Sequence, residues 1–545
     1  MTGLANDARP APRDREADDF ERLFPLAELE LNVIREATVG GRDVCVVRTA
    51  AGVFAFGAVC PHQGGSMCAG IVRGTMDPSP RNEYHFGHEG EVVVCPWHGY
   101  EFDMRTGESV SGVIRGRVGS FPVEVREGDV YCSPRRRRPP ARLIARQLRE
   151  RIMAALSVEQ QELTSLIRTF VDREVLPVAS ELDHRDEFPG ELVEAMKKMG
   201  LFGITIPGEY GGLGLDLYTY ALVIKELSRG WISLSGVINT HFMAAWMILN
   251  FGTDEQKRRY LPRMATGEWR SAYSMTEPHA GSDVQAIRTR ARRDGDEFVI
   301  DGQKMWVTNG LRANMVMLLA VTDPQAQPRH RGMTAFILQK EGGAAEQPGL
   351  VVPPHLRKLG YRGVESTELV FDGFRTPADS VLGGASQTGQ GFKQFMAAVE
   401  LGRVNVAARA VGLATCALEQ AIAYASQRET FGKVISQHQA IQLKLAQMAT
   451  RLKAAELLVA EAAQLKSTGA RADLEAGMAK LFATETALEV TTEAMRIHGG
   501  YGYSQEYMIE RLYRDAPLLI LGEGSNEIQQ LVIARRLLES SASGR

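Results

Sequence analysis

Short apolar runs alternate with glycine-containing turns through residues 21–132. Three of these runs are VCVVRTAAGVFAFGAVC (residues 44–60), EVVVCPWHGYEFD (91–103) and SFPVEVREGDVYC (120–132). Runs of this length, rich in Val, Phe and Tyr and bounded by turn residues, are typical of β-strands. The pattern therefore predicts a small all-β domain over residues 21–132.

The period becomes helical after about residue 155, in EQQELTSLIRTFVDREVLP (159–177) and ELVEAMKKMGLFG (191–203). Strand-like runs return over residues 270–380, and helical spacing resumes after residue 388. Apolar positions at steps of four and three then place one stripe on a long helix of a bundle. The stripe comprises Ile441, Leu445, Met448, Leu452, Ala455 and Val459. We expect helices, then a β block, then helices.

Two segments lack these patterns. Residues 1–20 are rich in Pro, Ala and charges, as in a flexible tail. SPRRRRPPARLIARQLRER (133–151) places four arginines between prolines, which predicts a solvated linker, with a docking site for an acidic partner as the alternative. The predicted organisation is a tail (1–20), an all-β domain (21–132), a linker (133–154), a helical domain (155–270), a β domain (271–385) and a helical bundle (386–540).

Composition narrows the class of protein. Hydrophobic residues make up 44% of the 545 residues and charged residues 24%, as in soluble globular proteins, and the net charge of −3 gives no general attraction to nucleic acid or membrane. The first twenty residues contain no apolar stretch, and no run reaches the length of a membrane span. Six cysteines are few, which favours a reducing, cytoplasmic location where clustered cysteines are metal ligands rather than disulfides.

Two short motifs offer metal ligands. CPHQGG contains Cys60 and His62, and CPWHGYEFD contains Cys95 and His98. Two thiolates and two imidazoles can bind one zinc ion, or a two-iron cluster with Cys on one iron and His on the other. Each pair follows a strand-like run and opens a glycine-containing loop, without the helix that usually supplies the His ligands of a zinc finger. The surroundings therefore favour the two-iron cluster.

The two motifs resemble the ligand loops of a Rieske [2Fe–2S] domain, and the resemblance covers about residues 22–132. It departs from the family in a long insert that holds His85 and His88, which we interpret as surface residues. In high-potential Rieske proteins a further disulfide joins the loops; Cys68 could form one half, but Trp97 stands where the other half would be.

High-potential Rieske proteins carry a Ser and a Tyr whose hydroxyls hydrogen-bond to the cluster, and Tyr100 and Phe102 stand at these two places here. Fewer hydrogen bonds to the sulfurs stabilise the reduced cluster less. The resemblance therefore implies a potential in the lower part of the Rieske range of about −150 to +300 mV. Such a cluster moves single electrons and needs a partner centre.

Non-haem iron is the first candidate for this centre, as in Rieske oxygenases, whose site takes two neighbouring histidines and a carboxylate. Beyond the Rieske-like region no two histidines lie within twenty residues of each other, which disfavours that site. These histidines are His184, His241, His279, His330, His355, His438 and His498.

Flavin is the second candidate, and four stretches support it. YSMTEPHAGSD (273–283) can present backbone N–H groups to phosphate, and Trp306 and Thr308 lie two apart on a predicted strand, so both should face one side. SQRETFGK (426–433) offers Arg428 and Phe431 for a pyrophosphate and an adenine. In LLILGEGSNEIQQLVIARR (518–536), Glu523 stands between two glycines after an apolar run, where desolvation would raise its pKa as a general base requires.

Together these stretches resemble the acyl-CoA dehydrogenase family over about residues 155–540, with PGEYGGLGLD, KLGYRGVESTELVF and RIHGGYGY in support. The resemblance implies a helical domain, a central β domain and a four-helix bundle in a homotetramer or homodimer. FAD would lie between the β domain and the bundle, completed by a neighbouring subunit. The residues implied around FAD are Tyr273, Met275, Thr276, Ser282, Trp306, Thr308, Arg428, Phe431, Gln439, Gly499, Gly500, Ser525 and Glu527.

Glu523 matches the catalytic base of the family, and Arg403 is implied nearby. A minority of the family carries the base one residue before that arginine, where this chain has Gly402. The resemblance implies that Glu523 removes the α-proton of an acyl-CoA or carrier-bound acyl thioester while the β-hydride passes to flavin N5. Gly522 replaces the bulky Tyr found before the base in many straight-chain enzymes, which suggests a branched, cyclic or aryl-bearing acyl group.

The fusion suggests that electrons leave the flavin one at a time through the Rieske cluster toward an external redox partner. The alternative is a flavin-dependent monooxygenase, in which a reductase charges the cluster and the cluster reduces flavin. Relatives of that kind generally lack the glutamate base, so Glu523 disfavours it. A third hypothesis makes the Rieske region a redox sensor or docking module, which an intact set of four ligands disfavours.

Overall fold

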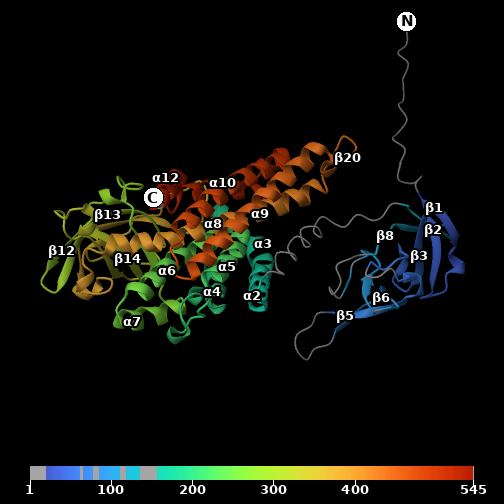
Figure 1. The fold of residues 1–545 in the computed structure, drawn as a ribbon, viewed down its shortest axis with the longest axis horizontal. Coiled ribbons are helices and arrows are strands. Elements are labelled where there is room, and N and C mark those ends of the chain that lie inside the picture. Colours follow the sequence, from blue (N-terminus) through green and yellow to red (C-terminus); the bar gives the residue numbers. More distant parts are fainter. Residues whose placement is uncertain are drawn as a thin grey trace, which may run out of the picture. The chain divides into compact units, whose positions relative to one another are not determined.

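The computed structural model describes residues 20–61, 65–77, 85–97, 99–107, 109–110, 118–134 and 156–543. The predicted tail falls almost wholly outside these residues, as do His62, His98 and nearly all of the predicted linker. The chain divides into two compact units, residues 1–144 and 145–545. Figure 1 shows a small β-rich unit and a larger unit of helices and strands, and each is described by itself.

The first unit is built of short antiparallel strands, as predicted. Three of them form the sheet β1-β10-β9, four form β2-β3-β4-β8 and three form β5-β6-β7. The strands are β1 (Glu21–Pro25), β2 (Ile34–Val39), β3 (Arg42–Thr49), β4 (Gly52–Gly57), β5 (Ile71–Asp77), β6 (His85–Val94), β7 (Glu101–Asp103), β8 (Ser120–Phe121), β9 (Val123–Arg126) and β10 (Asp129–Cys132). The side chains of His85 and His88 lie outside the described part, so their predicted surface position stays a prediction.

A disulfide joins Cys45 and Cys68, with Cα atoms 5.2 Å apart. This corrects the expectation that the clustered cysteines act only as ligands. Cys45 lies on β3, and Cys68 lies in the short 3-10 helix η3 (Met67–Ala69) that packs against this strand. The chain folds back between these residues, which are 23 apart in sequence, so spacing alone did not reveal the pair.

The second unit begins with helices. They are α2 (Val158–Phe170), the π-helical turn η4 (Val171–Val175), α3 (Leu176–Arg185), α4 (Gly190–Lys198), α5 (Leu217–Gly230), α6 (Ile232–Phe251) and α7 (Asp254–Ala265). Capping boxes start α2 and α7: the side chains of Ser157 and Thr253 accept from the backbone three residues on, and Gln160 and Gln256 reciprocate. The apolar sequence of α6 is explained by its position in the core.

Two helices in the described residues are long and apolar enough to cross a membrane. They are α6 and α8, whose most apolar windows are 89% and 67% buried inside the protein. Core helices of water-soluble proteins pass the same test of length and composition. The two helices are therefore weak evidence for a membrane span.

An eight-stranded sheet follows the helices, with the order β11-β14-β12-β13-β18-β17-β16 and with β15 paired to β14. Its strands are β11 (Ser271–Ser274), β12 (Arg290–Asp294), β13 (Glu297–Thr308), β14 (Met315–Val321), β15 (Met333–Gln339), β16 (Glu346–Gln347), β17 (Leu350–Val351) and β18 (Ser366–Pro377). Every residue of β14 is buried, as its unbroken apolar sequence MVMLLAV requires.

The C-terminal part is a helical bundle, which Figure 1 shows beside the sheet. It contains α8 (Gly391–Ala425), α9 (Gln439–Ser467), α10 (Asp473–His498), α11 (Ile509–Leu521) and α12 (Asn526–Ser543), with the small hairpin β19 (Glu429–Thr430) and β20 (Lys433–Val434) between α8 and α9. The predicted stripe on α9 is confirmed: Met448, Leu452, Ala455 and Val459 are buried, and Ile441 and Leu445 pack partly buried against the same core.

Candidate active site and cofactor sites

Glu523 lies in the short turn between α11 and α12. Its φ of +53° and the φ of +83° at Gly524 place both residues in the left-handed region, which turns the chain sharply. The fully buried Lys480 of α10 stabilises this turn through three hydrogen bonds. Its Nζ donates to the carbonyls of Ile520 (2.8 Å) and Gly524 (3.0 Å) and to Asn526 Oδ1 (2.7 Å). Burial lowers the pKa of Lys480 to about 8.

The carboxyl of Glu523 points into the core between α6 and α8. Burial raises its pKa, and the hydrogen bond from Asn239 is the largest of the opposing effects. Asn239 Nδ2 donates to Glu523 Oε1 over 3.2 Å, and the positive charges of Arg409, Arg403 and Lys480 also favour the carboxylate. A carboxyl with a raised pKa that can still ionise is suited to accept a proton.

Gly402 makes the room for this carboxyl. A Cβ at this position of α8 would lie 2.8 Å from Glu523 Cδ, 2.9 Å from Oε2 and 3.2 Å from Met243 Sδ. No side chain other than hydrogen fits there unless the carboxyl moves. Position 402 can therefore carry no carboxyl side chain while the Glu523 carboxyl occupies this space.

Arg403 follows directly on α8 and is 9% exposed. Its Nε has no hydrogen-bond partner within the described residues. A buried donor of this kind is usually satisfied by a bound group. The charge of Arg403 favours the ionised form of Glu523.

The strand β11 and the loop after it carry Tyr273, Met275 and Thr276. The Tyr273 hydroxyl donates to the Phe395 carbonyl of α8 over 3.0 Å, and burial raises the pKa of Tyr273 well above its usual value. The Thr276 carbonyl accepts from the backbone N–H of Met305 over 2.9 Å. These contacts hold the loop after β11 against β13 on one side and α8 on the other. Ser282, farther along this loop, is exposed.

A buried ion pair clamps the same loop. Lys304 Nζ donates to the Met275 carbonyl and to Glu277 Oε1, both over 2.9 Å, and burial lowers the pKa of Lys304 to about 8. Glu277 also accepts from the backbone N–H groups of Arg288 (2.7 Å) and Thr289 (2.9 Å). The sequence analysis did not predict this ion pair. Glu277 lies in the stretch YSMTEPHAGSD, and Lys304 lies two residues before Trp306.

The burial of Trp306, Val307 and Thr308 follows the expected alternation, but the strand carries a bulge beside them. The pairing of β13 with β18 shifts register between Lys304 and Val307, and Trp306 has a φ of +61°. This bulge turns the indole outward, where it is 55% exposed. A β-bulge changes the direction of a side chain in this way, and the sequence pattern did not predict the bulge. Lys304 and Val307 are buried, whereas Trp306 and Thr308 are not.

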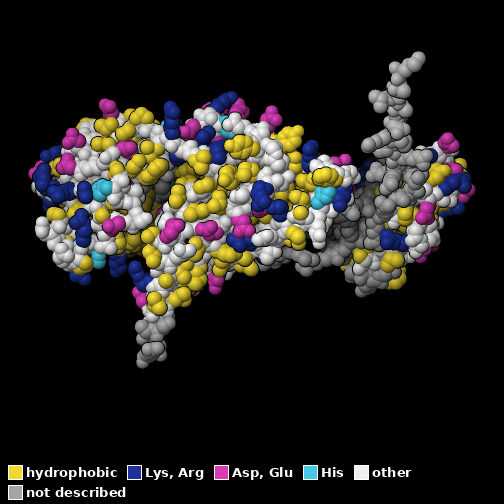
Figure 2. Space-filling view, turned by 90° about the horizontal axis from the view of Figure 1, so that it is seen from above, with side chains coloured by type: hydrophobic (Ala, Val, Ile, Leu, Met, Phe, Trp, Pro, Cys, Tyr) yellow, Lys and Arg dark blue, Asp and Glu magenta, His cyan; other side chains and the backbone are white. Residues whose placement is uncertain are grey.

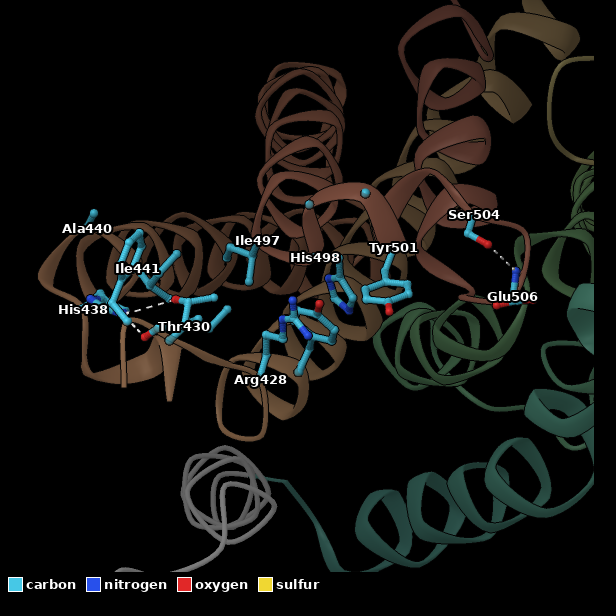
Figure 3. Close-up of a pocket in the computed structure, with 15 residues that line it drawn as sticks. Arg428, Thr430, His438, Ala440, Ile441, Ile497, His498, Tyr501, Ser504 and Glu506 are labelled. Atoms are coloured by element: carbon cyan, nitrogen blue, oxygen red, sulfur yellow. Dashed lines mark hydrogen bonds between the residues drawn. The ribbon is translucent and has the colours of Figure 1, made fainter. Parts of the chain in front are cut away.

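A pocket of about 800 Å³ is lined by several of the residues implied around FAD. Arg428, Phe431, Gly499 and Gly500 all line it; Gln439 is exposed beside the lining residue Ala440. Figure 3 shows the Arg428, His498 and Tyr501 side chains grouped in this pocket, away from the hydrogen-bonded pair Thr430 and His438. The Arg428 guanidinium lies 5.9 Å from the Tyr501 ring centroid.

Phe431, the aromatic residue expected at the adenine, has 96% of its surface exposed in one chain. Ser525 and Glu527, which are also implied around FAD, lie at the start of α12, where a hydrogen bond from Ser525 lowers the pKa of Glu527. An open pocket lined by aromatic and cationic side chains can hold an adenine and a pyrophosphate.

In the first unit, Cys60 follows β4 and Cys95 follows β6, and both thiols are buried. The two loops pack against each other, since a Cβ on Gly65 would lie 3.0 Å from the Trp97 ring. His62 and His98 lie outside the described residues, and within the described part no group of three metal ligands occurs. Two buried thiols on adjoining loops nevertheless fit the cysteine half of a [2Fe–2S] site.

Sequence reasoning missed Asn239, Lys480 and Glu277. Asn239 is a polar residue inside the otherwise apolar α6, and Lys480 is a lone cation on a buried face of α10. Buried polar groups need partners, so each was a detectable signal. Their partners lie 284, 44 and 27 residues away along the chain, and no spacing rule connects them.

Comparison with known families covers nearly the whole chain. The family model described as Acyl-CoA dehydrogenase, N-terminal domain matches residues 157–268, the middle domain matches 272–374 and the C-terminal domain matches 389–538. The Rieske [2Fe-2S] domain matches residues 21–122.

Individual relatives agree. The chain is 42% identical over 381 residues to an acyl-CoA dehydrogenase of Bacillus subtilis, covering 70% of this chain and 98% of that protein. It is 42% identical over 391 residues to (2S)-methylsuccinyl-CoA dehydrogenase of Cereibacter sphaeroides, covering 71% of each. The structure of butyryl-CoA dehydrogenase from Megasphaera elsdenii aligns with a TM-score of 0.66 at 35% identity, covering 70% of this chain and 99% of that one.

The order of domains, the carboxyl of Glu523 and the matching relatives lead to one assignment. The chain belongs to the acyl-CoA dehydrogenase family, with a Rieske [2Fe–2S] domain fused N-terminal to it, and is an FAD-dependent oxidoreductase that acts on CH–CH bonds.

Proposed function

We propose that this enzyme dehydrogenates an acyl thioester, carried by CoA or a carrier protein, with Glu523 as the base. The inward carboxyl of Glu523, with its raised pKa and the space that Gly402 leaves for it, is the observation that carries the proposal. Bound FAD supplies a hydride acceptor, and the Rieske cluster supplies a carrier of single electrons.

The residues around Glu523 support the transfer of an α-proton. Asn239 fixes one carboxyl oxygen, and Lys480 fixes the backbone on both sides of the base, so the free oxygen has a defined direction. Positioning of this kind lowers the barrier because the reacting atoms need no further ordering. Arg403, with its unsatisfied Nε, favours the ionised form of the base before the proton arrives.

The proposed flavin site draws on two subunits. Tyr273, Met275, Thr276, Trp306 and Thr308 would face the ring, with Ser282 at a phosphate. Ser525 and Glu527 would close the site from α12. The adenine half would be held by residues of the neighbouring subunit, namely Arg428, Phe431, Gln439, Gly499 and Gly500.

An oligomer, which we propose to be a homotetramer or homodimer, accords with the exposed apolar surface. Figure 2 shows hydrophobic side chains gathered on one face of the larger unit. Exposed apolar residues on the C-terminal helices include Leu443, Leu457, Leu531, Leu537 and Leu538. Patches of this kind mark sites of protein association.

We further propose that the cluster passes electrons from the flavin domain to an external redox partner. A tether keeps the acceptor at high effective concentration, so no diffusional encounter is required. The monooxygenase alternative has the opposite flow, and the intact base argues against it. We propose a cytoplasmic location from the small number of cysteines, although the Cys45–Cys68 disulfide is more typical of an oxidising compartment.

Direction of electron flow is tested by anaerobic mixing of the holoenzyme with a panel of acyl-CoA thioesters. We expect the flavin absorbance to bleach and the EPR signal of the reduced Rieske cluster to follow. A Cys95→Ser variant should still bleach but lack the signal, because it loses a cluster ligand. Reduction of cluster before flavin by NAD(P)H and a reductase, with no bleaching by any thioester, would instead establish the monooxygenase alternative.

The acyl group is tested with the same panel. A Cβ at Gly522 would meet only the Leu518 carbonyl, at 3.4 Å, so the glycine leaves open space beside the base. Because this space can take a substituent at Cα or Cβ, we expect branched acyl-CoA to have a higher kcat/KM than straight chains of equal carbon number. The branched substrate of the Cereibacter relative is consistent with this. A clear preference for unbranched chains contradicts the hypothesis.

Gly402→Ala tests the packing of the base. The added methyl group would lie 2.8 Å from Glu523 Cδ and displace the carboxyl, which should slow flavin reduction by substrate about 100-fold, because small misplacements of a catalytic group are costly. Gly477→Ala on α10 is the matched control, since its Cβ would lie 3.4 Å from Ile533 Cγ1 without a clash. Equal rates in the two variants at equal thermal stability would show that activity does not depend on the space at Gly402.

Asn239→Leu tests the pKa of the base. Activity needs ionised Glu523, so it is lost as the pH falls through the raised pKa. The Asn239 hydrogen bond lowers that pKa, and its removal should therefore move the acidic limb of kcat/KM upward by about one pH unit. Asn405→Leu is the control, since Asn405 donates to the Tyr220 hydroxyl instead. A limb that stays in place or moves down refutes this role of Asn239.

A further inference from the structure

The helix α8 carries a second buried cation on the face that meets the base. Arg409 follows Gly402 by seven residues, which is two helical turns or about 10 Å along the helix. Its side chain is 4% exposed. Since helical side chains lean toward the N-terminus, the guanidinium of Arg409 extends back toward Gly402 and Glu523. Its charge accordingly lowers the pKa of Glu523.

The guanidinium of Arg409 has few partners for a buried charge. Arg409 Nη2 donates to the Ile232 carbonyl over 3.3 Å, and the guanidinium carbon lies 4.8 Å from the Tyr361 ring centroid. Its Nε has no partner, and no carboxylate among the described residues lies within ion-pair distance of it.

Another buried arginine of the same core is satisfied differently. Arg229 is 3% exposed and forms ion pairs with Glu226, Glu419 and Asp172. A buried guanidinium is stable when carboxylates neutralise it and fill its donors. Arg409 acts on Glu523 only through its charge and forms no ion pair within the described residues, so an anion from outside the chain would complete its donors.

The surroundings of Arg409 lead to the reacting centre. Along α6, the Ile232 carbonyl accepts from Arg409, Gly236 packs against the Tyr361 hydroxyl (2.0 Å from an added Cβ), and Asn239 holds Glu523. Burial raises the pKa of Tyr361, and the side chains of Arg409 and Thr308 beside its hydroxyl oppose that rise. One face of α6, one face of α8 and Tyr361 therefore connect the buried cation to the base and to the proposed flavin edge.

We propose that Arg409 binds the distal carboxylate of the acyl group, so that the substrate is a thioester of a dicarboxylic acid. The planar guanidinium can donate two parallel hydrogen bonds to a carboxylate, which gives both affinity and orientation. The thioester end then lies at Glu523 and the carboxylate end at Arg409. This inference rests on the proposed dehydrogenation and names its class of substrate.

The test compares charged and uncharged thioesters. Glutaryl-CoA and 2-methylsuccinyl-CoA are mixed anaerobically with the holoenzyme beside pentanoyl-CoA and 2-methylbutanoyl-CoA, in which a methyl group replaces the carboxylate. We expect wild type to be reduced by at least one carboxyacyl-CoA with kcat/KM about 10- to 100-fold above that of its uncharged counterpart, as a hydrogen-bonded charge pair provides.

Because Arg409 also favours ionised Glu523, Arg409→Met should slow turnover of both kinds of thioester, and its effect on binding is read from the ratio of their kcat/KM values. This ratio should fall to about one through a raised KM for the carboxyacyl-CoA alone. Arg409→Lys should restore part of the preference. Flavin content and thermal unfolding verify that each variant folds. As a measure without turnover, Glu523→Gln should bind the carboxyacyl-CoA more tightly than its counterpart, and the added Arg409→Met change should remove the difference.

Three results overturn the inference. Wild type that prefers the uncharged thioesters has no carboxylate site, although it remains a dehydrogenase. An Arg409→Met variant that loses activity equally on all four thioesters shows that Arg409 only supports Tyr361 and Glu523. Failure of every acyl thioester, including the wider panel, to bleach the flavin rejects the proposed function itself.

Discussion

A carboxyl group must enter the core between two helices and still be able to ionise, and the structure around Glu523 depends on this requirement. The side chain enters through a turn with two residues in left-handed conformations, and α8 can approach only because position 402 has no Cβ. Desolvation raises the pKa of the carboxyl, and one amide and three cations limit that rise. Burial thus makes the carboxyl a stronger proton acceptor, and the polar partners favour its ionised form.

Buried lysines hold the loops that surround this centre. Lys480 donates to the carbonyls of the base turn, and Lys304 to the loop after β11. Lys340 binds the carbonyls of Leu311, Ala313 and Glu341 in the same manner. Loop carbonyls buried away from water need donors, and an ammonium group can serve three at once. Irregular segments can in this way be as firmly placed as the helices and strands they connect.

The fold class, the two ligand loops, the apolar stripe of α9 and the stretch around Glu523 could be predicted from local sequence. Each of them depends on consecutive residues with a clear period or motif. Contacts between distant segments could not be predicted in this way. Cys45 and Cys68 meet because a loop folds back, Asn239 reaches Glu523 across two domains, and the bulge before Val307 re-aims Trp306. Packing decides these features, and a single sequence does not show which surfaces meet.

The choice of arginine at position 409 follows from the same burial that tunes the base. Lysines buried in this unit, such as Lys480 and Lys304, have their pKa lowered to about 8. Buried Lys225 instead has a raised pKa because it pairs with Glu456, and a lysine at 409 would have no such partner among the described residues, so burial would lower its pKa. Guanidinium stays protonated under these conditions. The environment that makes a carboxylate basic therefore requires arginine wherever a permanent positive charge is needed beside it.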